Sequence, residues 1–276
     1  NTCDALPSFS LESSKHLRSR LLLLFRQLLN RPVTDITLKL AAVLELTHNT
    51  SLVFDDLIDY SEGRMNERVG YKEDNKGQVL RTGLMLYSGI YRVLCSLNDI
   101  KWVDRFSKVI HEMSVGEVSR GVFCAAGERP SIEKYTEAIR GTTGSLFALS
   151  ARMAAHEDDD NENSAVKLYE FGNCLGLAYQ ICDDLNDMAE DFRNELWTLP
   201  FIFSADDGKT IYSGNGKLPM IEVLSSGAIS KCIKLLTEKL DCCKEIISEF
   251  GNPVAATKVL GLCQWMESEA RNLSGE

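Results

Sequence analysis

The sequence predicts an all-α protein, and three observations support that prediction. Long segments carry apolar residues at spacings of three and four, which is the period of a helix with one buried face. Proline and glycine, which interrupt helices, number only 6 and 19 among 276 residues. No run of alternating apolar residues is long enough to require a strand. We therefore expect helices throughout rather than a β-sandwich with frequent turns.

Seven segments have the helical period. They span residues 17–29, 36–58, 78–97, 102–123, 131–155, 165–188 and 229–250. Breaks containing Gly, Pro, Asn or Asp fall at residues 31–32, 63–75, 127–130, 156–163, 206–219 and 251–253. The second and sixth segments are long and apolar, and each ends in a group of aspartates. The fifth begins at Ser131, which suits an N-cap because its hydroxyl can accept a backbone N–H from the first turn.

The composition is that of an ordinary globular protein, with 44% hydrophobic and 25% charged residues. A chain of this length can bury roughly 70–75% of its unfolded surface, so we treat residues 1–276 as a single domain. The net charge is −10, and no basic cluster provides a footprint for nucleic acid. No segment approaches the roughly 18–20 apolar residues of a membrane span. We expect a cytoplasmic protein, unless an organellar targeting peptide has been removed.

Nine cysteines are scattered through the apolar segments. They form no Cys-x-x-Cys pair, so neither a zinc site nor a redox motif is indicated. Reduced, buried cysteines with a structural role are the expected state.

One short acidic pattern occurs twice, each time at the end of a long apolar helix. The copies comprise Asp55, Asp56 and Asp59, and Asp183, Asp184 and Asp187. Within each copy the first and last aspartates stand at i and i+4 on one helix face, where like charges repel. A cation removes this repulsion, and carboxylate oxygens suit Mg²⁺, which commonly shares its shell with phosphate oxygens. Two facing copies are therefore predicted to hold several Mg²⁺ ions and a diphosphate between them.

The residues around these copies extend the pattern. Residues 45–59 read E-L-T-H-N-T-S-L-V-F-D-D-L-I-D, and residues 171–187 read F-G-N-C-L-G-L-A-Y-Q-I-C-D-D-L-N-D. Three shorter stretches are S-K-H-L-R-S-R-L at 14–21, G-S-L-F at 144–147 and T-L-P at 198–200. In this order the motifs resemble those of the trans-isoprenyl diphosphate synthase (polyprenyl synthetase) family.

The resemblance implies a fold and a reaction. The fold would be an isoprenoid-synthase-type bundle of about ten or more helices around a deep apolar cavity, assembled as a homodimer or a heterodimer. The reaction would be a Mg²⁺-dependent ionisation of an allylic diphosphate, followed by attack of isopentenyl diphosphate on the allylic cation. The apolar helices would exclude water from that cation.

The resemblance also implies roles for individual residues. The catalytic set would be the six aspartates, with the metal held by Asp55, Asp59 and Asp183. Isopentenyl diphosphate would contact Lys15, Arg18 and His48. The other substrate-binding residues would be Arg64, Thr142, Thr143 and Gln180.

Several basic residues of the family pattern are missing from this chain. Met65 follows Arg64 where the family has a second arginine. Thr142 and Leu196 stand where the family has lysines. All the aspartates expected to bind metal are present, whereas several basic residues expected to bind diphosphate are missing. Three hypotheses about function therefore remain. They are a prenyltransferase that uses isopentenyl diphosphate or another acceptor, a terpene synthase that cyclises the allylic cation, and a silent partner subunit of a true synthase.

The residues before Asp55 bear on product length. Ser51 and Thr50 lie four and five positions earlier, about one turn deeper along much the same helix face. Both are small and leave room for a prenyl tail, so we expect a product in the C15–C20 range. Phe54 points about 100° away from the Asp55 direction and cannot close the same path.

Overall fold

The computed structural model describes residues 16–61, 76–126, 129–156, 162–205, 212–213, 216–217, 223 and 227–274. Two residues of the expected site, Lys15 and Arg64, lie outside the described residues. Of the helices in the described ranges, none has the length and hydropathy needed to cross a membrane.

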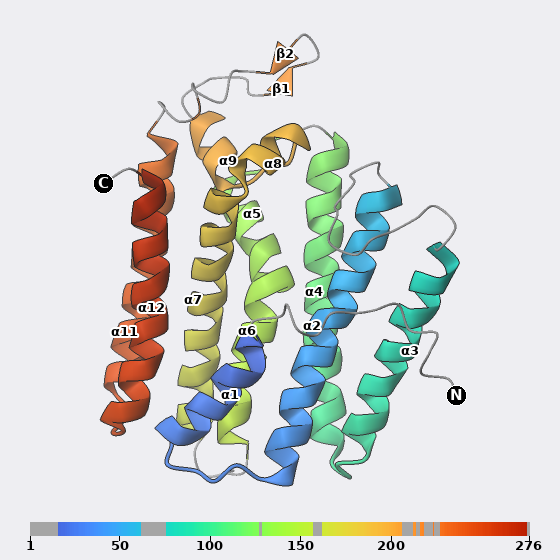
Figure 1. Ribbon diagram of the computed structural model, residues 1–276, viewed down its shortest axis with the longest axis vertical. Coiled ribbons are helices and arrows are strands. Elements are labelled where there is room, and N and C mark those ends of the chain that lie inside the picture. The colour runs from blue at the N-terminus through green and yellow to red at the C-terminus, as the bar shows by residue number, and fades with distance from the viewer. Residues whose placement is uncertain are drawn as a thin grey trace.

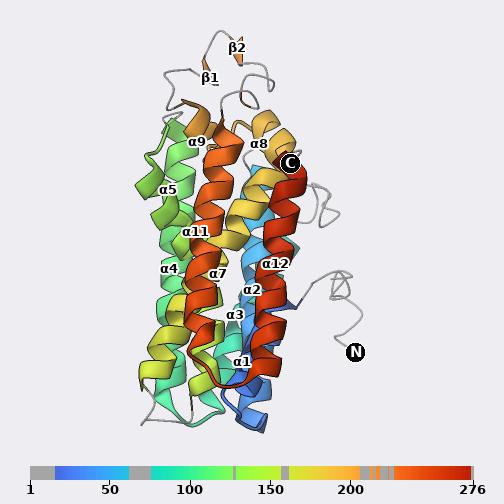
Figure 2. The same ribbon diagram turned by 90° about the vertical axis from the view of Figure 1, so that its left-hand side faces the viewer.

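The long helices run mostly along the longest axis of the molecule (Figures 1 and 2). The first four are α1 (Leu17–Leu28), α2 (Asp35–Ser61), α3 (Lys76–Cys95) and α4 (Ile100–Ala126). A continuous central run consists of α5 (Ile132–Ile139), the π-helix η5 (Arg140–Gly144), α6 (Ser145–Arg152) and the 3-10 helix η6 (Met153–Ala155). The last five are α7 (Glu162–Asn186), α8 (Met188–Arg193), α9 (Leu199–Ala205), α11 (Ala228–Ser248) and α12 (Pro253–Ser274).

The all-α prediction is confirmed, with three differences in detail. The fifth predicted segment is interrupted by the π-helix η5. The break at residues 206–219 contains a pair of antiparallel two-residue strands, β1 (Tyr212–Ser213) and β2 (Gly216–Lys217). Strands this short carry no alternating pattern that a sequence could display. Three described helices, α8, α9 and α12, have no predicted segment of their own. Pro253 begins α12 directly after the break at 251–253, at a position where its missing N–H costs nothing.

Two helix starts rest on side-chain capping. Ser131 accepts a hydrogen bond from the Lys134 backbone N at 3.2 Å, which confirms the predicted N-cap of α5. Helix α1 is capped from a distance, because Glu45 of α2 accepts a hydrogen bond from the Ser19 backbone N at 2.9 Å. This bond fixes the start of α1 against the middle of α2.

The core is a single hydrophobic cluster to which all the long helices contribute, with α1, α6 and α7 near its centre. Phe25 of α1 meets Phe171 of α7 edge to face, with ring centroids 4.9 Å apart, and neither ring is exposed. The seven cysteines whose side chains the structure describes are free, and four of them are buried. The expectation of reduced cysteines holds for these seven, although Cys95 is exposed.

Glycines bring the central helices unusually close together. A Cβ atom on Gly172 of α7 would lie 2.4 Å from the Ala148 Cα of α6. One on Gly176 would lie 2.7 Å from the Gly144 Cα in the π-helix. On the other side, a Cβ on Gly141 would lie 2.7 Å from the Glu112 carbonyl oxygen of α4. The π-helix is thus held between α4 and α7 by backbone contact.

The two aspartate-bearing helices end at the same end of the bundle. Both α2 and α7 rise in Figure 1 and finish near its top, where α8 and α9 also lie. The C-terminal end of α4 reaches the same level. The fold therefore gathers the two acidic patterns, which are more than a hundred residues apart in the chain, at one end of the molecule.

Candidate active site

The first acidic pattern occupies the last turns of α2, and the second the last turn of α7. Asp55 and Asp183 are both partly exposed, as a metal or substrate ligand must be. Asp187 is also partly exposed and stands at the start of α8. Asp56 and Asp59 lie in α2, but their side chains are outside the described part of the structure.

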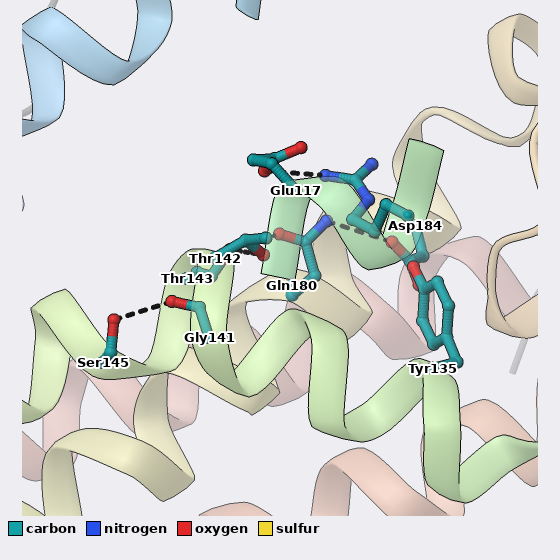
Figure 3. A network of polar contacts seen from close by, with 9 residues as sticks. Glu117, Tyr135, Gly141, Thr142, Thr143, Ser145, Gln180 and Asp184 are labelled. Atoms are coloured by element: carbon teal, nitrogen blue, oxygen red, sulfur yellow. Dashed lines mark hydrogen bonds and ion pairs between the residues drawn. The ribbon is translucent and has the colours of Figure 1, made fainter. Parts of the chain in front are cut away.

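Asp184 differs from its neighbour because it is only 2% exposed and fully engaged (Figure 3). Its Oδ2 accepts hydrogen bonds from the Tyr135 hydroxyl at 2.8 Å and the Leu199 backbone N at 3.2 Å. Its Oδ1 accepts one from the Gln180 amide at 3.1 Å. Burial raises the pKa of Asp184, while these hydrogen bonds oppose the rise. Asp184 therefore connects α5, α7 and α9. It lies behind the partly exposed Asp55, Asp183 and Asp187, which we call the acidic surface.

Asp191 of α8 is a second buried carboxyl that the sequence analysis missed. Desolvation, followed by the charge of Asp184, raises the pKa of Asp191 to about 7. Two carboxyl groups thus share a confined region, where like charges make ionising both costly. A sequence signal exists in retrospect, because Asp191 follows Asp187 at i+4.

Gln180 links the acidic end of α7 to the π-helix. Its side-chain oxygen accepts a hydrogen bond from the Thr143 hydroxyl at 2.8 Å, and its amide donates to Asp184 (Figure 3). The hydroxyls of Thr142 and Thr143 are 3.5 Å apart. Three predicted substrate-binding residues, Thr142, Thr143 and Gln180, are therefore brought together. Their position at a π-helix fits the frequent occurrence of π-bulges at functional sites.

Arg18 and His48 lie close to each other, and Arg18 is within electrostatic reach of Asp183 of the acidic surface. The Arg18 guanidinium lies over the Phe147 ring, 4.7 Å from its centroid, in a cation–π arrangement. Burial lowers the pKa of Arg18 to about 10, while the negative charges of Glu45 and Asp183 oppose the shift. Burial and the positive charge of Arg18 lower the pKa of His48 to about 3. At neutral pH this group of residues, which we call the Arg18 corner (Arg18, His48 and Phe147), thus contains a charged guanidinium and a neutral imidazole.

Arg120 of α4 is a basic residue that the sequence analysis missed. Its Nη1 lies 3.5 Å from the Glu117 Oε1, and both side chains are about one-third exposed. Burial acts to lower the pKa of Arg120, but surrounding negative groups outweigh it and raise the pKa. These groups are the carboxylates of Glu117, Asp184 and Asp55, from α4, α7 and α2. The i, i+3 spacing of Glu117 and Arg120 could have indicated the pair.

The two arginines relate to the acidic helices in parallel ways. Arg18 interacts electrostatically with Glu45 of α2 and Asp183 of α7. Arg120 interacts in the same way with Asp55 of α2 and Asp184 of α7. Each guanidinium therefore lies within electrostatic reach of both acidic helices.

The proposed tail path and metal set are only partly described. Thr50 is 3% exposed, and its hydroxyl donates to the Leu46 carbonyl oxygen at 2.6 Å. The Ser51 hydroxyl donates to the His48 carbonyl oxygen at 2.8 Å. Phe54 packs toward α3, because a Cβ on Gly83 would lie 2.9 Å from its ring. Within the described ranges, no three His, Cys, Asp or Glu side chains are grouped so that they could hold a metal ion.

Comparison with known proteins gives consistent results at the level of sequence. Residues 4–195 match the polyprenyl synthetase family. The chain is 29% identical over 245 residues to a prenyl transferase of Porphyra purpurea, covering 80% of this chain and 75% of that protein. It is 28% identical over 200 residues to component 2 of a heptaprenyl diphosphate synthase from Bacillus subtilis, covering 72% and 55%.

Solved structures share the fold. A decaprenyl diphosphate synthase from Rhodobacter capsulatus aligns with a TM-score of 0.85 at 18% identity, covering 95% of this chain and 88% of that one. A polyprenyl synthase from Caulobacter crescentus, solved with calcium and isoprenyl diphosphate, aligns with a TM-score of 0.81 at 21% identity, covering 93% and 85%. With the family match spanning most of the sequence, the chain belongs to the polyprenyl synthetase family of trans-prenyltransferases.

Proposed function

We propose that this chain is a Mg²⁺-dependent prenyltransferase that condenses an allylic diphosphate with isopentenyl diphosphate. The observation that carries the proposal is the arrangement at the upper end of the bundle. Two helices with matching acidic ends finish there. The Arg18 guanidinium, with the neutral His48 near it, lies within electrostatic reach of Asp183 on one of them. The acidic surface and the Arg18 corner suit two separate diphosphates, one bound through metal and one bound by protein cations.

The allylic diphosphate belongs to the acidic surface. Asp55 and Asp183 are exposed enough to bind a metal ion, and their carboxylate oxygens are ligands that Mg²⁺ prefers. Asp59 completes the proposed set. When bound, Mg²⁺ would draw charge onto the diphosphate and assist its departure. Asp184 is placed to orient α7 rather than to bind metal, since Tyr135, Gln180 and Leu199 occupy its oxygens.

Isopentenyl diphosphate belongs to the Arg18 corner. The Arg18 guanidinium keeps its charge at neutral pH, and His48 can donate one N–H from its neutral ring. Lys15 would add a second charge on the same N-terminal segment. Once the C–O bond to the allylic diphosphate has broken, the acceptor's double bond would attack the allylic cation. The proton lost after that attack would pass to the departing diphosphate.

The same corner favours water exclusion. Phe147 is fully buried, and its ring contacts both the Arg18 guanidinium and the ring of Tyr179, whose centroid lies 5.5 Å away. Aromatic surface beside the charged groups limits the access of water, which would otherwise quench an allylic cation.

A terpene synthase is the second candidate, and one observation favours it. Thr142, which stands where the family has a lysine, contacts only its neighbour Thr143 in the described polar network. Together with Met65 and Leu196, it leaves the site with fewer cations than two diphosphates would call for. A silent subunit is the third hypothesis, supported by similarity to one component of a heptaprenyl diphosphate synthase.

Product analysis separates these hypotheses. Purified protein would be incubated with Mg²⁺, farnesyl diphosphate and labelled isopentenyl diphosphate. We expect a labelled, longer diphosphate. Unlabelled hydrocarbon would instead identify a cyclase, and the absence of both products would contradict the proposed condensation.

The product and assembly complete the proposal. We propose a product in the C15–C20 range, because Thr50 and Ser51 are small. We also propose a cytoplasmic dimer, formed with a second copy or a related subunit. Exposed apolar side chains on α3 and α4 support such an interface: Leu80, Leu84, Val115, Val118 and Val122, each at least 44% exposed.

A further inference from the structure

We propose that Arg120 binds the allylic diphosphate directly, supplying a cation from α4 that no recognised motif of this chain contains. The inference rests on the proposed function, since it concerns the same acidic surface. It also identifies where some of the positive charge missing at Met65, Thr142 and Leu196 is regained.

The hydrogen bonding of Arg120 leaves it available. A guanidinium has five N–H donors in a planar fork. In the described structure its one hydrogen-bonded partner is Glu117, through Nη1 at 3.5 Å. Charge-assisted pairs of this type normally close to about 2.7–2.9 Å and are often bidentate. The ion pair between Arg120 and Glu117 is therefore weak, and it leaves N–H donors of the guanidinium available to another anion.

The nearby carboxyl group of Asp184 does not consume those donors. Its oxygens already accept hydrogen bonds from Tyr135 and Gln180 (Figure 3) and from the Leu199 backbone N. Asp184 thus attracts Arg120 through its charge while its lone pairs are directed at other groups. The guanidinium is held near the acidic surface without being locked to it.

The location of Arg120 suits a ligand that bridges two helices. Its electrostatic partners include Asp55 of α2 and Asp184 of α7, and its side chain is 33% exposed. A diphosphate bound by metal between α2 and α7 would meet the guanidinium from the α4 side. Two parallel N–H groups match two oxygens of one phosphate, which a lysine cannot reproduce.

A purely structural role makes a different prediction. Arg120 also offsets the negative charge of the buried Asp184, so its removal is expected to lower stability in either case. Only direct binding predicts a loss of affinity for the anion. The test must therefore measure diphosphate binding apart from folding and turnover.

Inorganic pyrophosphate is the probe, titrated calorimetrically into the full chain with excess Mg²⁺. Arg120→Gln should weaken pyrophosphate binding about tenfold to a hundredfold, the usual range for a lost charge-assisted contact. Arg105→Gln is the matched control, because it removes the same charge from the same helix about 22 Å away. It should bind pyrophosphate as the wild type does.

Arg120→Lys guards against a folding defect in the glutamine variant. Arg120→Lys keeps the positive charge but loses the planar, two-donor geometry of the guanidinium. Its affinity for pyrophosphate should be several-fold weaker than that of the wild type and stronger than that of Arg120→Gln. Unchanged or tighter binding in both folded Arg120 variants would overturn the inference. If wild type and Arg105→Gln bind no pyrophosphate, the inference and the proposed function both fail. If binding depends on Arg120 but no labelled product forms, the inference stands and the proposed condensation fails.

Discussion

Asp183 and Asp184 are adjacent in sequence, but burial gives them different tasks. Asp183 remains partly exposed at the acidic surface, whereas Asp184 is 2% exposed and accepts three hydrogen bonds. The repeated acidic pattern predicts that both belong to the site, but cannot say which faces solvent. That distinction depends on Tyr135 and Leu199, which come from other helices. The position of Arg120 in the site could not be predicted for the same reason, because Asp55 of α2 and Asp184 of α7 come near it only in the fold.

This division predicts opposite outcomes for two neighbouring substitutions. Asp183→Ala should abolish turnover with little change in thermal stability, because it removes a proposed metal ligand and relieves like-charge repulsion. Asp184→Ala should lower the free energy of unfolding by about 1–3 kcal/mol or more, since buried donors lose their acceptor. Thermal unfolding and turnover would be measured on both variants. Equal stability losses would contradict the assignment.

His48 predicts a specific pH dependence of stability. Its pKa is about 3 in the folded chain and about 6.5 when unfolded, so the unfolded state binds the extra proton between these values. The stabilisation is complete above pH 6.5 and is lost as pH falls toward 3. The loss attributable to His48 should approach about 1.4 kcal/mol per pH unit within the window.

His48→Gln provides the comparison for that measurement. Urea unfolding between pH 7 and pH 4.5 should show a shallower loss for the variant than for wild type. Asp191 contributes with the opposite sign, because its raised pKa makes the folded state bind more protons below pH 7. It is present in both proteins, so their difference isolates His48. Parallel curves would contradict a buried neutral imidazole.

At the scale of elements, the sequence predicts the helices better than their junctions. Periodicity locates α1 to α4, α7 and α11 to within a few residues, because each buries one face along its length, but no predicted segment covers α12. It does not predict the π-helix η5, which depends on close contact with α4 and α7. Gly141, Gly144, Gly172 and Gly176 make that contact possible, but a lone glycine in a helical pattern signals only a missing side chain.

The α6–α7 contact can be tested at Gly172. Replacing Gly172 by Ala places a Cβ 2.4 Å from the Ala148 Cα, so the backbones must separate. We expect a loss of roughly 1–3 kcal/mol in unfolding free energy, as for other overpacked positions. Gly261→Ala in α12 is the control, because its Cβ would meet nothing within 4 Å. That variant should be about 0.5–1 kcal/mol more stable.

Helix α2 predicts an effect on product length. Thr50 is almost fully buried on the turn below Asp55, whereas Phe54 packs toward Gly83 of α3. Thr50→Phe should therefore shorten the product or block long allylic substrates, while Phe54→Leu should leave product length unchanged. Chromatography of the dephosphorylated products would measure both. An unchanged spectrum for Thr50→Phe would mean that the tail follows another path.

At the scale of the whole molecule, the fold combines distant parts of the chain into one site. The order of the motifs predicts the family and the helical bundle. Two acidic helix ends can share metal ions and a diphosphate only if the fold brings them together. The fold places both ends at one end of the molecule, with Arg18 and Arg120 each near an acid from both helices. The pairing of Arg18 with Phe147 could not be predicted, because it requires α1 to pack on α6.

The central claim is that this molecule binds two diphosphates at separate places, and Arg18 tests it most directly. Steady-state kinetics of Arg18→Gln would give the KM for each substrate, with Arg105→Gln as the matched charge control. We predict that the KM for isopentenyl diphosphate rises about tenfold to a hundredfold while that for the allylic diphosphate changes less than threefold. Equal increases for both substrates, or no increase for either, would contradict a second diphosphate site.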